Sequence, residues 1–225
     1  MKNAPRSLSQ KAHRQLIGFL GLCLPLVVYV LAGLRPTPSL PQWIRLESVS
    51  AYYYTGAVAA FVGVIFALSL FLFTYPGYEN VVADRVAGTF GGFAALGVVL
   101  FPTAAPTELL RLQWWNSWMG AFHYTAAVSL FVSFILFSLW LFPKSDVPVH
   151  KQPREKRVRN VVYISCGVVM IISMLWAGLA GFLNKPIFIP EAFAIEAFAV
   201  SWLVKGEAEH TLVRVAHRLF PNQRD

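Results

Sequence analysis

Six apolar runs alternate with short polar segments along the chain. Each run has about 18–25 residues, enough for a helix rising 1.5 Å per residue to cross a ~30 Å hydrocarbon core. Neither strict apolar–polar alternation nor a heptad repeat occurs, so the pattern does not favour a barrel or a coiled coil. The pattern predicts an all-α fold, a polytopic membrane protein with a six-transmembrane-helix bundle. The predicted spans are 16–34, 53–75, 86–105, 118–142, 161–183 and 187–204.

The composition strengthens this prediction. Of the 225 residues, 56% are hydrophobic and 13% are charged. Soluble domains are about half apolar and about one quarter charged. The composition therefore excludes an ordinary soluble domain and a disordered chain. The two cysteines, Cys23 and Cys166, both lie inside apolar runs, so a disulfide scaffold is not indicated either.

The distribution of positive charge predicts the orientation. Of the 19 lysines and arginines, 15 lie before the first predicted span, after the last one, or in the segments 76–85 and 143–160. Cytoplasmic segments carry an excess of Lys and Arg, so both termini are predicted to be cytoplasmic. This predicts a basic cytoplasmic tail over 1–15, a transmembrane domain over 16–206 and an amphipathic cytoplasmic tail over 207–225. The expected location is the bacterial cytoplasmic (inner) membrane.

The net charge of +8 also bears on partners. In a soluble protein it would raise the question of nucleic acid. Here the cations lie next to apolar runs, so we expect contact with the lipid bilayer and with anionic headgroups at the cytoplasmic face, and no nucleic acid. Small residues at Gly88 and Gly92 favour close helix packing, either within the bundle or in a homo-oligomer or larger membrane complex.

Glu196 is the most informative polar residue of the last run. It lies about ten residues from the outer end, near the expected midplane of the membrane. A carboxylate at that depth is costly and is a functional candidate by default. It shares a helix face with Ala192 and Ala199, so we expect it to point into the bundle. It either carries a proton or binds a ligand, or it is a neutral side chain hydrogen-bonded to a serine of another span.

Several polar residues are expected in the outer half of the bundle, where they could line an outward-facing pocket with Glu196 as its floor. Two of them, Glu191 and His123, also have a structural explanation. The helix dipole stabilises a carboxylate in the first turn of a helix, and a lone membrane histidine usually forms a hydrogen bond within the bundle. These candidate ligand-binding residues are His123, Glu191, Tyr53, Tyr54 and Ser50.

A second polar group is expected at the cytoplasmic edge of the spans. Ion pairs among helix ends would explain it without any activity. Its principal members are Asp84, Asn160 and Lys205, with Glu79, Asn80, Arg85 and Glu207 nearby.

Metal and cofactor chemistry finds little support in the sequence. His123 is the only histidine inside a predicted span. A haem with paired axial histidines needs at least two histidines, and a three-histidine zinc site needs three. The sequence also contains no GxGxxG, P-loop, HExxH or GxSxG pattern. No metal and no cofactor are therefore expected.

Short motifs carry a resemblance to known proteins. They include SVSAYYYTG at 48–56, YPGYEN at 75–80, LFPT at 100–103 and SWLVKGE at 201–207. Over roughly residues 46–207 this pattern resembles a group of bacterial multispan membrane proteins without an assigned reaction, which implies the architecture and little more. A weaker likeness links the chain to the alkaline ceramidase and adiponectin-receptor superfamily. Those proteins have seven spans and a zinc ion held by three histidines. In this chain only His123 could match one of the three.

Three classes of function remain open at this point. The first is a protein that binds or transports a small or lipidic molecule in the outward-facing pocket. The second is a structural or assembly subunit, in which the polar residues only fix helix packing. The third is a membrane-embedded lipid hydrolase, which would need a nucleophile or a metal site that the spacing of residues does not show.

Overall fold

A computed structural model of the chain describes residues 10–75, 77, 82–145, 148 and 151–207. In this part of the chain there are six α-helices and no strand, which confirms the predicted all-α fold. A short 3-10 helix, η1 (Ser50–Tyr54), precedes α2, and a π-helical segment, η2 (Phe137–Leu141), continues α4. The α-helices are α1 (Gln10–Leu34), α2 (Val58–Phe73), α3 (Val82–Leu100), α4 (Ser117–Leu136), α5 (Arg154–Phe182) and α6 (Phe188–Lys205).

Four helical stretches are long and apolar enough to cross a membrane: α1, α3, α4 together with η2, and α5. The α2 helix is apolar but has only 16 residues. The α6 helix has 18 residues and includes Glu191, Glu196 and Lys205. Several apolar helices of this length fit an integral membrane protein.

Several helix boundaries differ from the predicted spans. The α2 helix begins at Val58, because the preceding residues form η1 and the backbone is extended at Thr55. The α3 helix ends at Leu100, two residues before Pro102, because a proline disfavours helical backbone in the residue before it. The α5 helix begins at Arg154, directly after Pro153, and so includes charged residues that hydropathy had assigned to a loop.

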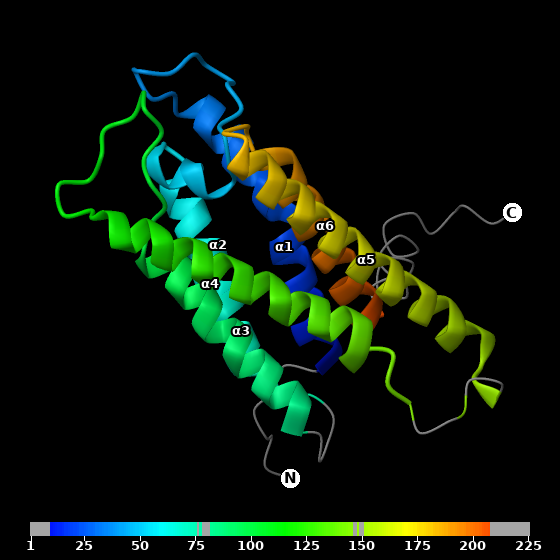
Figure 1. The fold of residues 1–225 in the computed structure, drawn as a ribbon. Coiled ribbons are helices and arrows are strands. Elements are labelled where there is room, and N and C mark those ends of the chain that lie inside the picture. Colours follow the sequence, from blue (N-terminus) through cyan, green and yellow to red (C-terminus); the bar gives the residue numbers. More distant parts are fainter. Residues whose placement is uncertain (1–9, 76, 78–81, 146–147, 149–150, 208–225) are drawn as a thin grey trace, which may run out of the picture.

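The helices pack mainly against their neighbours in sequence, with one exception. The α3 helix packs against both α2 and α4, and α5 packs against α6. The exception is α1, which packs against α6 as well as α2, so that the first and last helices lie side by side (Figure 1).

Small residues on α3 allow this close packing. A Cβ atom added at Gly88 would lie 2.8 Å from the carbonyl oxygen of Leu72 on α2. A Cβ added at Gly92 would lie 2.9 Å from the ring of Phe73. The expectation that Gly88 and Gly92 serve packing within the bundle is therefore confirmed.

The bundle has two ends, which are distinguished by the helix termini that lie there. Gln15 near the start of α1 donates a hydrogen bond to the carbonyl oxygen of Gly206 (2.8 Å), so α1 begins where α6 ends. We call this the terminal end, and we call the opposite end, which holds η1, the loop end (Figure 1).

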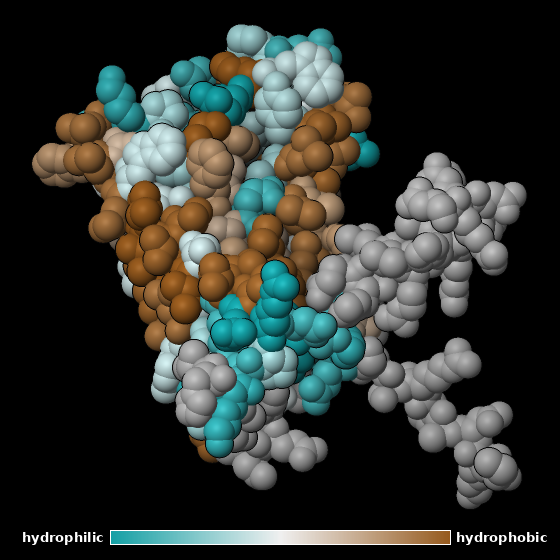
Figure 2. Space-filling view, turned by 90° about the vertical axis from the view of Figure 1, so that its right-hand side faces the viewer, coloured by the Kyte–Doolittle hydropathy of each residue, from teal (hydrophilic) through white to brown (hydrophobic). Residues whose placement is uncertain are grey.

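Figure 2 shows hydrophobic residues gathered across the middle of one face, with hydrophilic residues above and below them. Residues 1–9 and 208–225 lie outside the described residues, so the two predicted tails are not tested.

An aromatic cluster closes the core near the terminal end. Trp202 of α6 is 0% exposed, and its ring lies 5.0–5.1 Å from the rings of Tyr75, Phe137 and Phe142. Edge-on contacts at this spacing are favourable beyond the area that they bury. The cluster therefore joins α6 to η2 and to the chain that follows α2.

Candidate functional site

A cavity of about 50 Å³ extends from η1 into the middle of the bundle. We call it the central cavity. Helices α1, α2, α3, α4 and α6 all contribute to its walls, which are almost entirely apolar. Residues on these walls include Leu20, Leu24, Ile65, Phe131, Ile195 and Phe198.

Glu191 places a carboxylate at the loop end of the central cavity. It lies in the first turn of α6, and one of its oxygens accepts a hydrogen bond from the backbone N–H of Val49 (2.7 Å). The start of α6 is fixed to the same segment, because the N–H groups of Ile187 and Phe188 both donate to the carbonyl oxygen of Glu47 (2.7 Å each). The arrangement therefore holds an acidic side chain at the rim of an apolar space.

Ser50 is the second sequence-predicted residue that lines the central cavity. It begins η1, one residue after the Val49 amide that binds Glu191. The structure thus brings Ser50 and Glu191 together, although 141 positions separate them in the sequence.

The central cavity is not lined by His123, Tyr53 or Tyr54. His123 is 2% exposed, and its Nδ1–H donates to the carbonyl oxygen of Phe101 (2.7 Å). The Tyr54 hydroxyl donates to the carbonyl oxygen of Thr103 (2.6 Å). The α3 helix ends before Pro102, so the backbone carbonyls that follow have no partner within a helix. The side chains of His123 and Tyr54 donate hydrogen bonds to two of these carbonyls.

Glu196 is partly exposed and is not among the residues that line the central cavity. The structure therefore places Glu191, and not Glu196, at the central cavity. The reason is helical geometry, because five residues at 100° each place Glu196 on another face from Glu191. Residues 191, 195 and 198 share the cavity face at the i, i+4, i+7 spacing.

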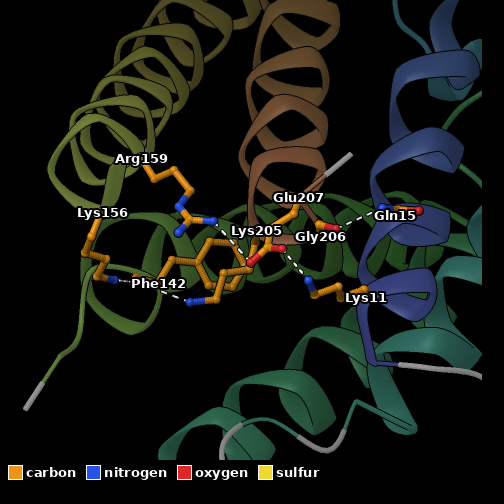
Figure 3. A network of polar contacts seen from close by, with 8 residues as sticks. All are labelled: Lys11, Gln15, Phe142, Lys156, Arg159, Lys205, Gly206 and Glu207. Atoms are coloured by element: carbon orange, nitrogen blue, oxygen red, sulfur yellow. Dashed lines mark hydrogen bonds and ion pairs between the residues drawn. The ribbon is translucent and has the colours of Figure 1, made fainter. Parts of the chain in front are cut away.

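A second cavity, of about 110 Å³, lies at the terminal end (Figure 3). We call it the basic pocket. Side chains from the N-terminal parts of α1 and α5 and from the end of α6 meet there. Its lining residues are Arg14, Lys156, Arg159, Tyr163, Lys205 and Glu207.

Backbone carbonyls hold two of these lysines in place. The ammonium of Lys205 donates to the carbonyl oxygen of Phe142 (3.2 Å), and Lys205 is 7% exposed. Lys156 donates to the same carbonyl (3.1 Å) and to that of Lys144 (3.3 Å). The chain leaving η2 therefore fixes two ammonium groups on one side of the pocket.

Glu207 bridges two cations on the other side of the pocket. Its carboxylate accepts from Lys11 of α1 and from Arg159 of α5 (3.2 Å). The hydrogen bond from Lys11, together with the charges of Lys11 and Arg159, lowers the pKa of Glu207 below its ordinary value of 4.5. Glu207 therefore stays ionised near neutral pH and offsets part of the local positive charge.

The predicted cytoplasmic-edge cluster is only partly assembled. Lys205 lies in the basic pocket, and Asp84 is buried at the start of α3 within electrostatic range of Lys205. Asn160 instead donates to the side chain of Gln152 (3.2 Å) and does not line the pocket. Glu79 and Asn80 lie outside the described residues.

Sequence reasoning did not single out Arg14, Lys156 and Arg159 as site residues. It used their charges only to orient the chain. A signal was nevertheless present, because the predicted topology places these three cations and Lys205 at the same membrane face, each close to the end of a span.

Comparisons with protein-family models, with curated proteins and with solved structures give no match to this chain. Both resemblances noted in the sequence therefore stay predictions. Among the residues that the structure describes, no group of three or more His, Cys, Asp or Glu side chains is placed to hold a metal ion.

Proposed function

We propose that the chain is an integral membrane protein that binds a small or lipidic molecule in the central cavity. In this proposal six helices cross the cytoplasmic membrane of a bacterium, with both termini in the cytoplasm. The excess of Lys and Arg at the terminal end supports that orientation. Transport of the bound molecule would be a further step of the same function.

One observation carries the proposal: an apolar space inside the bundle has a carboxylate at its rim. Ligand sites are typically pockets lined by apolar side chains, with a few polar groups that orient the ligand. The central cavity has this form, with Glu191 and Ser50 at one end. We therefore expect a ligand with an apolar body and a hydrogen-bonding or cationic group that faces Glu191.

The size of the cavity limits the ligand. At about 50 Å³ it is smaller than the 150 Å³ apolar cavity that holds benzene in a soluble protein. Its walls are not sealed, because Leu20, Val64 and Ile195 are partly exposed. A lipidic ligand therefore needs these side chains to move apart, whereas a smaller ligand needs less movement.

A structural or assembly role is the second candidate, and one observation favours it. Several buried polar side chains donate to a carbonyl of a neighbouring helix or loop, as His123 does to Phe101 and Ser133 does to Ala87 (2.9 Å). Such bonds hold helices together without a ligand.

A single substitution can fill the central cavity without changing the charge of the protein. In Ile195→Trp the indole would occupy the cavity, whereas in Val200→Trp it would lie on the exposed face of the same helix. Native mass spectrometry of protein purified in mild detergent then reports the molecules retained. We expect the wild-type and Val200→Trp proteins to retain a small molecule or lipid that Ile195→Trp has lost.

A matched pair of glutamate variants locates the polar contact. We expect Glu191→Gln to weaken retention of the molecule and Glu196→Gln to leave it unchanged, because only Glu191 lines the cavity. If wild type and Ile195→Trp retain the same molecules, or none, the binding proposal is wrong and the structural role is favoured.

A further inference from the structure

We propose that the basic pocket binds a phosphate group, either in the headgroup of an anionic lipid or as free phosphate. This inference concerns the terminal end of the molecule and does not rest on the ligand proposed for the central cavity.

The first argument is the balance of charge around the pocket. Among the residues that the structure describes, four cationic side chains and one carboxylate, that of Glu207, line it. Lys11 adds a further cation beside Glu207, and Asp84 adds a carboxylate within range of Lys205. Counting all of these groups, the site retains a net positive charge.

The second argument is burial. Arg14 is 9% exposed and Lys205 is 7% exposed. Cations that only set orientation can remain in water, where like charges are screened. Charges removed from bulk water are screened much less, so these buried cations attract an anion in the pocket more strongly than exposed ones would.

The third argument is the kind of donor that the pocket presents. Arg159 has five N–H groups in a planar fork, and its ion pair with Glu207 occupies one nitrogen. Lys156 and Tyr163 line the same pocket. Arginine and lysine donors of this kind suit the oxygens of a phosphate group.

The fourth argument is location. The pocket lies between the ends of α1, α5 and α6, where the chain leaves the apolar part of the bundle. Basic pockets between membrane helices on the cytoplasmic side are typical sites for anionic headgroups. Its volume of about 110 Å³ is also larger than that of the central cavity.

The test uses two probes and three variants of the full chain in mild detergent. The lipid probe is phosphatidylglycerol, compared with zwitterionic phosphatidylcholine, with bound lipid counted by native mass spectrometry. The free probe is sodium phosphate, compared with sodium chloride at equal ionic strength, with the thermal midpoint as readout. The variants are Lys205→Gln and Glu207→Gln at the pocket, and Lys151→Gln as an exposed control near the same end.

We expect Lys205→Gln to weaken binding of the effective probe about tenfold, as is typical when a charge-assisted hydrogen bond is lost. Lys151→Gln should bind like the wild type, since it removes the same charge from outside the pocket. Glu207→Gln should bind more tightly, because it removes the carboxylate that competes with the anion. A variant that had merely lost its fold could not show tighter binding.

The pattern of binding identifies the source of the phosphate group. Selective retention of phosphatidylglycerol, without a thermal shift in sodium phosphate, assigns the site to a lipid headgroup. A thermal shift in sodium phosphate alone assigns it to free phosphate. The proposal is overturned if neither probe binds, or if Lys205→Gln and Glu207→Gln bind both probes as the wild type does.

Discussion

At the scale of single residues, Gly88 shows how a missing side chain sets the distance between two helices. A Cβ atom there would lie 2.8 Å from a backbone oxygen, that of Leu72, which cannot move without shifting α2. Gly178 on α5 provides the contrast, because nothing lies within 4 Å of a Cβ atom at that position.

We therefore expect Gly88→Ala to lower the free energy of unfolding by about 1–3 kcal/mol, as is typical of overpacking in a well-packed core. Gly178→Ala should leave it unchanged or raise it slightly, because alanine is the better helix former. Thermal unfolding of both variants in the same detergent measures the difference. Equal midpoints would show that the contact between α2 and α3 is looser than described.

The two glutamates of α6 show a limit of sequence reasoning at this scale. Glu191 and Glu196 both lie in a run that is apolar on every side, so periodicity does not show which face meets the cavity. Depth in the membrane, together with a helix face shared with Ala192 and Ala199, favoured Glu196. The structure shows that Glu191 meets the cavity, where it accepts a hydrogen bond from Val49, the residue just before η1.

At the scale of elements, serine hydroxyls tie α3 to both of its neighbours. Ser69 of α2 donates to the carbonyl oxygen of Gly92 (2.8 Å), and Ser133 of α4 donates to that of Ala87 (2.9 Å). Both serines are 0% exposed. The α2–α3–α4 unit therefore has a polar contact on each side of its middle helix.

Replacing either serine by alanine should cost about 0.6 kcal/mol, the average for hydrogen bonds between membrane helices. The double variant Ser69→Ala/Ser133→Ala should lose the sum, because the two bonds share no partner. Thr125→Val is the control, since the Thr125 hydroxyl bonds to Ala121 within the same helix. Unfolding in a denaturing detergent gives the three values, and a marked departure from the sum would show that the two contacts are coupled.

Much of the element level could be predicted from the sequence. Long apolar runs predict helices, and all six were found near their expected positions. The boundaries failed where local backbone chemistry outweighed hydropathy. Pro102 ends α3 before the apolar run ends, and Ser50–Tyr54 forms a 3-10 turn although Tyr53 and Tyr54 begin an apolar run.

At the scale of the whole molecule, Glu207 joins both ends of the described chain. It follows α6 and binds Lys11 of α1 and Arg159 of α5. Sequence analysis could place all of these charges at one membrane face, but not in one pocket. Their convergence depends on which helices are neighbours, above all on α1 lying beside α6.

This bridge predicts a dependence of stability on pH. The pKa of Glu207 is lowered in the folded state, so its contribution is present above the ordinary value of 4.5 and is lost as the pH falls through the lowered pKa. We therefore expect the thermal midpoint of Glu207→Gln to fall less than that of the wild type as the pH is lowered from roughly 6 to 3. Glu155→Gln, on an exposed part of α5, should show the same fall as the wild type. A Glu207→Gln profile parallel to that of the wild type would contradict the prediction.

The pairing of α1 with α6 has a consequence for how the protein is made. Gly18 and Gly21 of α1 lie against Leu203 and Phe198 of α6. A ribosome produces α1 first and α6 only after every other described helix. Until then the glycine face of α1 has no partner from its own chain, and the central cavity lacks the wall that carries Glu191. Synthesis of α6 is therefore the step that gives α1 this partner and completes the wall of the central cavity.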